Sequence, residues 1–347
     1  MIRHDPHAII EITRPGMTDG QGTVVYDSWK AKRLFKSIDV ELVTGETSQA
    51  TITLFDPKFR VIDSFAPTAP TEQSVVRVWL GFGEDLGEPV FKGLLAQLER
   101  GDRDTTFTVF DMGYKMKLEK KAGYKNKKDD LAILKELATR NGLQFEGPEN
   151  PLKLEPHNTA TQDEQTDWEW FRERAEDAGL VFFVRHDTMF AKYPAKVGTP
   201  ALTIRNRVDF NITPEFEFIF RTPENQDGKP KLIAHRRRGK AGQRVEGQSD
   251  VSPGTRTDVF LKKDAAKPTK SKLSKRAQAQ KDLQREHAFE GHVEIFMPST
   301  RLDYRKTVAI ENVGKLMSGN YICDTVTYSF AAGHLNVTLD LYRDIKE

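Results

Sequence analysis

Hydrophobic and polar residues alternate along much of the first 110 positions, with the period of two that is typical of β-strands with one buried face. At residues 34–43 the alternation predicts one face of Leu34, Lys36, Ile38, Val40 and Leu42, and an opposite face of Phe35, Ser37, Asp39 and Glu41. Five more segments have strand character: residues 9–12, 51–55, 75–80, 90–98 and 105–110. Gly, Pro and Asp separate the six segments, which favours a barrel or a sandwich.

In the middle of the chain the period changes to that of an α-helix. A first helix is predicted from a cap at Asp129 or Asp130 to Asn141-Gly142, where Gly142 can take the left-handed conformation that ends many helices. Its apolar stripe comprises Leu131, Ile133, Leu134, Leu137 and Ala138. A strand is predicted to follow at residues 143–145.

A second helix is predicted to begin at Thr166, because Thr166 and Glu169 have the spacing of a capping box. Gly179 ends it, and a buried strand follows at residues 180–184. The apolar face of this helix comprises Trp168, Phe171, Ala175 and Ala178. Trp170 lies on the opposite, polar side, so it needs a further partner. That partner is either another part of the same chain or another subunit.

Strand patterns return in the last third of the chain. They occur at residues 216–220, 232–234, 259–261, 293–296, 307–310, 321–329 and 335–341, and a basic helix is predicted at residues 270–287. The chain is therefore mainly β with an α+β insertion. We predict a first β-barrel domain at residues 1–112, an α+β region with two helices at 113–205, and a second β-barrel domain at 206–347.

Composition restricts the class of protein and its compartment. The 347 residues are 37% hydrophobic and 30% charged, and no stretch approaches the roughly 18–20 consecutive apolar residues that cross a bilayer. The first residues lack the basic and apolar regions of a signal peptide. Cys323 is the single cysteine, so the chain cannot form an internal disulfide. We expect a protein that is assembled in a cytoplasm and does not insert into membranes by itself.

Charge is distributed unevenly, although the net charge is only +2. Residues 222–288 contain 17 Lys or Arg and 8 Asp or Glu, a local balance of +9. This basic segment either attracts acidic parts of the same chain or of neighbouring copies, or is a solvated loop. Nucleic-acid binding is less favoured, because few aromatic residues flank its arginines. The candidate interface residues in it are Arg236, Arg237, Arg238, Lys262 and Lys263.

The sequence contains no pattern that indicates catalysis or metal binding. Neighbouring carboxylates at residues 129–130, 163–164 and 173–177 have cap-like or solvated contexts, not those of an acid–base pair. His287 and His292 lack the spacing of zinc ligands. Cys323 lies in an alternating segment, which favours a small core residue over a nucleophile. Nucleophile elbows and phosphate or dinucleotide loops are missing. We predict no catalytic residue, no metal and no cofactor.

Two segments resemble the tail-hub family, which includes phage late control protein D, the baseplate hubs of contractile phages and the hub part of type VI secretion spike proteins. The first is TDWEWFRERAEDAGLVFFV, residues 166–184, with an acidic residue before an aromatic-rich helix, then glycine and an aromatic strand. The second extends from the basic helix through Gly319-Asn320-Tyr321 to the alternating residues 336–343. Both occur in the family's order.

The resemblance implies that each chain has two similar β-barrels and that three chains form a pseudo-hexameric ring. Such a ring would adapt a six-fold tail tube to a three-fold spike in a virion tail baseplate or an injection particle. The implied partners are a separate trimeric spike protein, the tail tube or a distal tube-initiator protein, baseplate wedge proteins and the tape measure. The alternatives are a peptidoglycan- or DNA-processing enzyme and a carbohydrate- or nucleic-acid-binding β protein.

Overall fold

The structure is a computed structural model of the chain. It describes residues 5–14, 22–63, 74–149, 159–194, 197–205, 212–220, 231–236, 243–248, 259–262, 289–296, 301–331 and 333–343. The basic helix that the sequence predicts at residues 270–287 lies outside these ranges. Within the described residues the fold is mainly β, as the sequence predicts.

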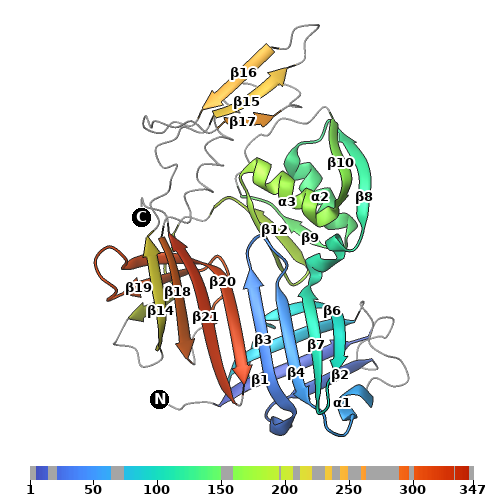
Figure 1. Cartoon of the computed structure of the whole chain (residues 1–347), viewed down its shortest axis with the longest axis vertical. Helices are drawn as coiled ribbons and strands as arrows, with labels where there is room; N and C mark the ends of the chain where they lie inside the picture. Colours follow the sequence, from blue (N-terminus) through green and yellow to red (C-terminus); the bar gives the residue numbers. More distant parts are fainter. Residues whose placement is uncertain are drawn as a thin grey trace.

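One large sheet contains thirteen of the described strands (Figure 1). Its first strand group comprises β1 (Pro6–Thr13), β2 (Thr23–Asp27), β3 (Phe35–Val43), β4 (Gln49–Phe55), β5 (Val75–Phe82), β6 (Phe91–Arg100) and β7 (Asp104–Asp111). Its second strand group comprises β13 (Leu202–Arg205), β14 (Ile212–Phe220), β18 (Phe289–Phe296), β19 (Thr307–Glu311), β20 (Gly319–Ala331) and β21 (His334–Arg343). Two short helices, η1 (Lys32–Leu34) and α1 (Arg60–Asp63), belong to the first group.

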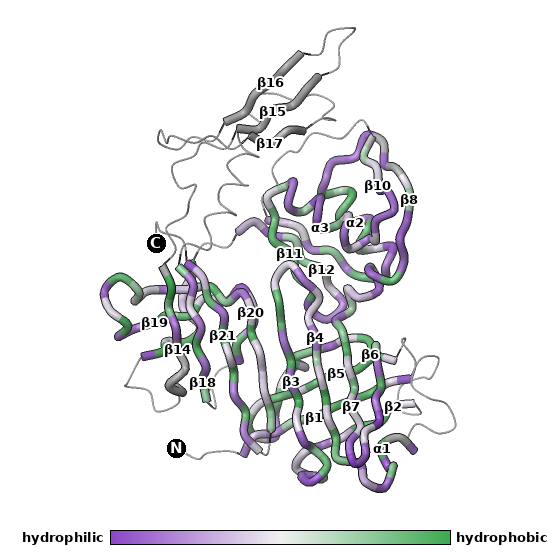
Figure 2. The backbone as a smooth tube through the Cα atoms, in the orientation of Figure 1, coloured by the Kyte–Doolittle hydropathy of each residue, from purple (hydrophilic) through white to green (hydrophobic). Residues whose placement is uncertain are grey.

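The two strand groups meet where β20 pairs with β3 in antiparallel fashion. One hydrophobic core extends through both groups and includes Val40 and Ile52 of the first and Val326 and Leu339 of the second. Hydrophobic and hydrophilic residues alternate along these strands (Figure 2). The predicted division into domains at residues 112 and 205 stays a prediction. β13 lies within the range predicted for the middle region, yet it pairs with β19 of the second group.

The predicted faces of β3 are wrong at its beginning. Phe35 is 8% exposed and packs with Ile38 in the core, whereas Lys36 is exposed. The register between β3 and β4 shifts between Phe35 and Ser37. Such an irregularity inserts a residue and reverses the side to which the preceding side chains point. The alternation from Ile38 onward is as predicted.

A helical module lies between the two strand groups in the sequence. It comprises η2 (Met112–Lys117), β8 (Lys120–Asn126), α2 (Asp130–Arg140), β9 (Gln144–Glu146), β10 (Thr159–Thr166), α3 (Asp167–Ala178), β11 (Val181–Arg185) and β12 (Thr188–Lys192). It has a hydrophobic core of its own, which includes Leu134, Trp168 and Phe182. Its strands form a β8–β10 pair and a sheet in the order β11-β12-β9.

The ends of both helices are as the sequence predicts. The Asp129 side chain accepts a hydrogen bond from the backbone of α2, and Gly142 follows with φ +76°. Thr166 and Glu169 form the reciprocal capping box of α3, and Gly179 ends it with φ +70°. These local signals need no tertiary contact, because capping groups and their partners are within a few residues of one another.

The basic segment contains a small sheet in the order β16-β15-β17, made of β15 (Lys231–Arg236), β16 (Gln243–Gln248) and β17 (Val259–Lys262). The strand islands predicted at residues 232–234 and 259–261 are therefore confirmed. β15 and β17 are parallel, and β15 and β16 are antiparallel. β2, β8 and β10, by contrast, are strands that the sequence analysis did not predict, and of these β8 and β10 are largely polar.

The second strand group repeats the strand order of the first. The series β3-β4-β7-β6-β5-β1 corresponds to the series β14-β18-β21-β20-β19-β13. Neighbours are antiparallel throughout, except that β13 and β19 are parallel where β1 and β5 are antiparallel. The chain thus contains two versions of one strand arrangement.

The register of the two series also repeats. Each of four opposed pairs in the first strand group has a counterpart in the second. Leu94–Phe110 corresponds to Ile322–Tyr342, and Val75–Leu94 corresponds to Thr307–Ile322. Gln49–Phe110 corresponds to Glu290–Tyr342, and Val40–Ala50 corresponds to Phe218–Gly291. The irregularity between Leu95 and Gln97 in β6 has its counterpart between Cys323 and Thr325 in β20. Bulges are specific features of a strand arrangement. Their coincidence indicates that the two halves have closely similar backbones.

Candidate functional site

The neighbouring carboxylates that the sequence contains support the helices. Asp129 caps α2. Asp130 is fully buried, and its carboxylate lies 3.6 Å from the guanidinium of Arg174. Asp177 lies 3.3 Å from the same guanidinium. Among the described residues no group of three His, Cys, Asp or Glu side chains could hold a metal ion.

Asp167, the acidic residue of the aromatic-rich motif, connects elements of the helical module through hydrogen bonds. Its carboxylate accepts hydrogen bonds from Arg140 and Asn141 at the end of α2 and from Gln162 in β10. Burial opposes its ionisation, but these hydrogen bonds hold the pKa of Asp167 below its usual value. The carboxylate therefore links the start of α3 to the end of α2 and to β10 by hydrogen bonds.

Cys323 is a core residue, as predicted. It is fully buried in β20, and burial raises the pKa of its thiol to about 12. A thiol with that pKa is protonated at neutral pH and has little nucleophilic character.

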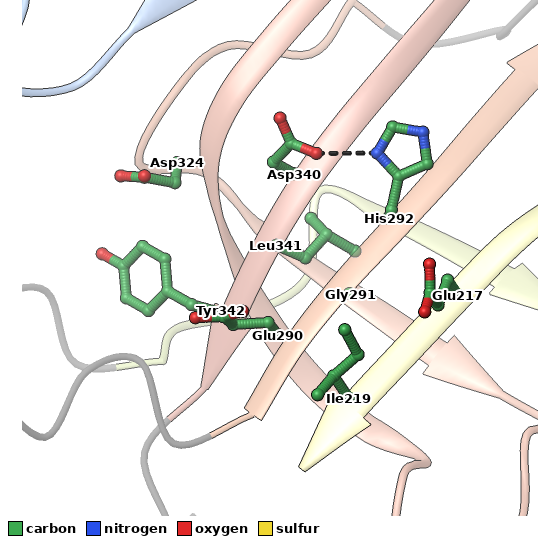
Figure 3. Close-up of a pocket in the computed structure, with 9 residues that line it drawn as sticks. All are labelled: Glu217, Ile219, Glu290, Gly291, His292, Asp324, Asp340, Leu341 and Tyr342. Atoms are coloured by element: carbon green, nitrogen blue, oxygen red, sulfur yellow. Dashed lines mark hydrogen bonds and ion pairs between the residues drawn. The ribbon is translucent and has the colours of Figure 1, made fainter. Parts of the chain in front are cut away.

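A hollow of about 280 Å³ lies on the second strand group (Figure 3). Its lining residues come from β14, β18, β20 and β21: Glu217, Ile219, Glu290, Gly291, His292, Asp324, Asp340, Leu341 and Tyr342. The His292 Nδ1 lies 2.8 Å from an oxygen of Asp340, and both side chains are about half exposed. The hollow is acidic and open to water, which differs from the apolar burial that tunes an acid–base pair.

Trp170 does not offer a surface to another subunit. The side chain is 1% exposed and belongs to the core of the helical module. α2, β10, β11 and η2 all pack against α3, so the helix is covered on more than its one apolar face. The interpretation that other parts of the same chain cover Trp170 agrees with this burial. The polar side assigned from helical periodicity is wrong at this position.

The predicted basic residues fall at one end of the small sheet as far as the structure describes them. Arg236 is the last residue of β15 and Lys262 the last of β17, and these strands are parallel. The carboxyl ends of parallel strands lie at the same edge of a sheet. Arg237, Arg238 and Lys263 lie outside the described residues. Whether these five residues form an interface stays a prediction.

Several strand edges of the large sheet are open within the described part of the chain, among them those of β2, β13, β14 and one end of β6. β6 pairs with β5 through residues 91–94 and with β7, but residues 97–100 have no strand on their other side. β14 pairs with β18 alone among the described strands. Figure 1 shows β6 and β14 on opposite sides of the molecule. Open edges expose backbone donors and acceptors and are sites of strand addition.

Side chains at the edges of β6 and β14 are partly exposed. Gln97 and Glu99 of β6 are exposed, and Leu98 is partly buried against the main core. In β14 Ile219 is 38% exposed, while Phe218 packs partly against the core. Sequence reasoning missed these residues, because their alternation is the same as that of strands with two neighbours. No sequence signal identifies them, because the strand order of the folded sheet decides which strands have an open edge.

The helical module is attached to both strand groups. The Gly45 N–H donates to the Phe182 carbonyl at 2.7 Å, and the Tyr304 hydroxyl donates to the Val184 carbonyl. Arg185 lies 3.3 Å from the carboxylate of Asp303 in an ion pair. β11 of the module thus contacts the loop after β3 and the segment before β19. None of the helices in the described part of the chain has the length and hydrophobicity to cross a membrane.

This arrangement of two equivalent strand groups and a helical module is the fold of phage tail proteins. The tail protein of Neisseria meningitidis MC58 is similar over 97% of both chains, with 12% identity and a TM-score of 0.67. The 43 kDa tail protein of prophage MuSo2 from Shewanella oneidensis is similar over 98% of this chain and 97% of that one, with 10% identity and a TM-score of 0.62.

A third similar structure comes from a secretion machine. It is an Escherichia coli component of the type VI secretion system that resembles the T4 tail proteins gp27 and gp5, with 6% identity and a TM-score of 0.57 over 89% of this chain and 73% of that one. No curated protein sequence matches the chain. A family model described as the Alg8 N-terminal domain matches residues 25–210, and the chain belongs to this family. The matched residues run from β2 past β13 and include the whole helical module.

Proposed function

We propose that the chain is a structural hub subunit of a contractile tail or a related injection machine. Three copies would form a ring in which six equivalent strand groups match a six-fold tail tube on one face and a three-fold spike on the other. The observation that carries the proposal is the repeat of strand order, register and bulge position within one chain. The shared fold of tail and type VI secretion proteins supports the same role.

A ring of this kind acts through contact area, so it requires no reacting side chain. Obligate interfaces bury roughly 2,000 Å² or more, and burial of apolar surface stabilises them. The partners we propose are a separate trimeric spike protein, the tail tube or a distal tube-initiator protein, baseplate wedge proteins and the tape measure. Its location would be the tail baseplate of a virion, or an injection particle, after assembly in the bacterial cytoplasm.

The molar mass of the purified protein tests the ring directly. Each chain has a mass of 39.5 kDa, so light scattering is expected to give about three times this value. Addition of the spike protein is expected to give a complex of three chains of each. A monomer or a two-fold oligomer at assembly concentrations would contradict the proposal.

The basic segment is proposed to contact an acidic partner in the tube, baseplate or spike. Replacement of Arg236, Arg237 and Arg238 by Gln is expected to weaken that contact, because it removes three positive charges from a region with a local balance of +9. The trimer itself is expected to persist. Unchanged copurification of every partner with the triple variant would exclude this role for the arginines.

A further inference from the structure

We propose that β6 of one copy adds to β14 of the next copy in an antiparallel pair, with Glu99 opposite Ile219. The inference rests on the proposed ring and specifies the contact that closes it. The chain already contains one pairing between its two strand groups, that of β20 with β3, which is called the internal joint here. The proposal follows from this internal joint and from the repeat of the two strand groups.

The internal joint is the pairing of β20 with β3. β20 belongs to the second strand group and β3 to the first, and residues 325–331 pair with residues 37–43. The side chains directed to the core at this joint are buried, including Val326, Tyr328 and Val40. Phe35 and Phe330 meet edge to face across it, with ring centroids 6.2 Å apart. A strand addition of this kind is therefore compatible with the backbones of both groups.

Because the two strand groups are equivalent, the internal joint predicts a second pairing between the corresponding strands. β20 corresponds to β6, and β3 corresponds to β14, in the repeated strand order. Within one chain this pairing occurs once, between β20 of the second strand group and β3 of the first. The reciprocal joint, β6 of a first group on β14 of a second group, joins two different copies. Both of its edges are open within the described residues.

The register follows from equivalent residues. Leu94 is equivalent to Ile322, and continuation past the shared irregularity makes Leu98 equivalent to Val326, Glu99 to Thr327 and Arg100 to Tyr328. On the other strand Phe218 is equivalent to Val40, so Ile219 corresponds to Glu41 and Phe220 to Leu42. The observed pairs are Val326–Leu42, Thr327–Glu41 and Tyr328–Val40. The expected pairs between copies are therefore Leu98–Phe220, Glu99–Ile219 and Arg100–Phe218.

The side-chain directions support this register. Leu98 and Phe218 both lie on the core face of their strands and pack partly against the main core. Glu99 and Ile219 lie on the opposite face and are exposed. Directly opposed residues in a sheet share a face, so the pair Glu99–Ile219 joins two side chains of the same face. A register displaced by one residue would place Leu98 opposite Ile219 and mix the two faces.

The positions of the edges fit a closed ring. β6 and β14 lie on opposite sides of the molecule (Figure 1), so the contact is heterologous, with different surfaces of the two copies. A heterologous contact produces a ring when its rotation closes and a filament when it does not. With two strand groups in each chain, three copies would contain three internal joints and three joints between copies.

A disulfide between the opposed residues tests the pairing. Directly opposed residues of an antiparallel pair have Cα atoms roughly 4.5–5.5 Å apart, within the range that a disulfide spans. The variant Glu99→Cys/Ile219→Cys is expected to form a covalent ring of three chains on mild oxidation, visible on a non-reducing gel and lost on reduction. The natural Cys323 is fully buried and does not compete.

Two matched variants define the result. Glu41→Cys/Thr327→Cys is opposed within the chain and is expected to form an internal disulfide without a change in mass. Glu99→Cys/Glu217→Cys is displaced by two residues, roughly 7–8 Å, and is expected to give no cross-link. Arg100→Cys/Phe218→Cys repeats the test at a second opposed pair, so that a folding defect in one variant does not decide it.

The outcomes separate this inference from the proposed function. A three-chain protein in which neither opposed pair cross-links, although the internal control does, would overturn the strand pairing and leave the ring intact. A ladder of cross-linked species longer than three chains would support the pairing and refute the three-fold ring. A protein whose mass is that of one chain, without cross-links between chains, would contradict both.

Discussion

Asp111 predicts a specific dependence of stability on pH. It ends β7 and is 2% exposed. One carboxylate oxygen accepts the Ser48 N–H at 2.6 Å, and the other accepts the Gly113 N–H at 2.9 Å. Burial raises the pKa of Asp111 to about 7, although these hydrogen bonds and the charge of Lys117 act in the opposite direction. The carboxyl thus connects the end of β7 to the residue before β4 and to η2 at the start of the helical module.

The sign of the effect follows from proton binding in the two states. In the folded protein Asp111 keeps its proton up to about pH 7, whereas in the unfolded chain it loses it near its ordinary pKa of 3.8. The folded state therefore binds more protons between these pH values, and the free energy of unfolding falls as pH rises through this window. At about 1.4 kcal/mol for each pH unit, the complete loss is about 4 kcal/mol, of which about 3 kcal/mol falls between pH 5 and pH 8.

Asp111→Asn removes the titration. The amide has one acceptor oxygen where the carboxyl has two, so one buried N–H loses its partner, at a cost of about 1–3 kcal/mol. At pH 5 the variant is therefore expected to be less stable than the wild type. At pH 8 the difference is expected to shrink or reverse, because the wild type has lost about 3 kcal/mol through ionisation.

Denaturant unfolding of both proteins at pH 5, 6, 7 and 8 measures this difference. A free-energy difference between wild type and Asp111→Asn that stays constant over that range would refute the titration of Asp111 in this window. Lys117→Met provides a second check. Removal of the positive charge raises the pKa of Asp111 further, so the stability loss is expected to extend to higher pH than in the wild type.

Three further changes have defined outcomes. Ile219→Glu places a negative charge opposite Glu99 of the next copy, which is expected to weaken each pairing between copies by about 1 kcal/mol. Sedimentation is expected to show a lower fraction of trimer. The additional change Glu99→Lys is expected to restore the trimer fraction. Cys323, whose thiol pKa burial raises to about 12, is expected to resist iodoacetamide at pH 8 in the folded protein and to react fully in denaturant, as mass spectrometry would record. Gly93→Ala puts a methyl group 2.1 Å from a carbonyl oxygen of β7 and is expected to lower the thermal midpoint by about 5 °C or more, whereas Gly123→Ala, with nothing within 4 Å, is not.

Local features of the fold are predictable from the sequence. The capping box of Thr166 and Glu169, the cap at Asp129 and the left-handed glycines after both helices are present as expected. Their partners lie within a few residues, so the local sequence contains both members of each interaction. The alternating strands of both β regions are predictable for a similar reason, because a buried face imposes a period of two.

Errors of the sequence-based prediction occur where distant segments decide the environment. Lys36 and Phe35 exchange faces because of a shift in the register of β3 against β4. Trp170 is buried because several elements pack around α3, whereas helical periodicity identifies a single apolar face. Side-chain periodicity describes one element in isolation and does not contain the number of its neighbours.

The sequence alone determined the change from strands to helices and back to strands, the caps that bound the helices and the separation of basic from acidic regions. The tertiary structure alone decided that β20 joins β3, that the two strand groups share one order and register, and that β6 and β14 have open edges. The physical reason is that strands pair through backbone groups, which are the same in almost every residue. Which strands meet therefore depends on the packing of the whole chain and not on the residues of either strand.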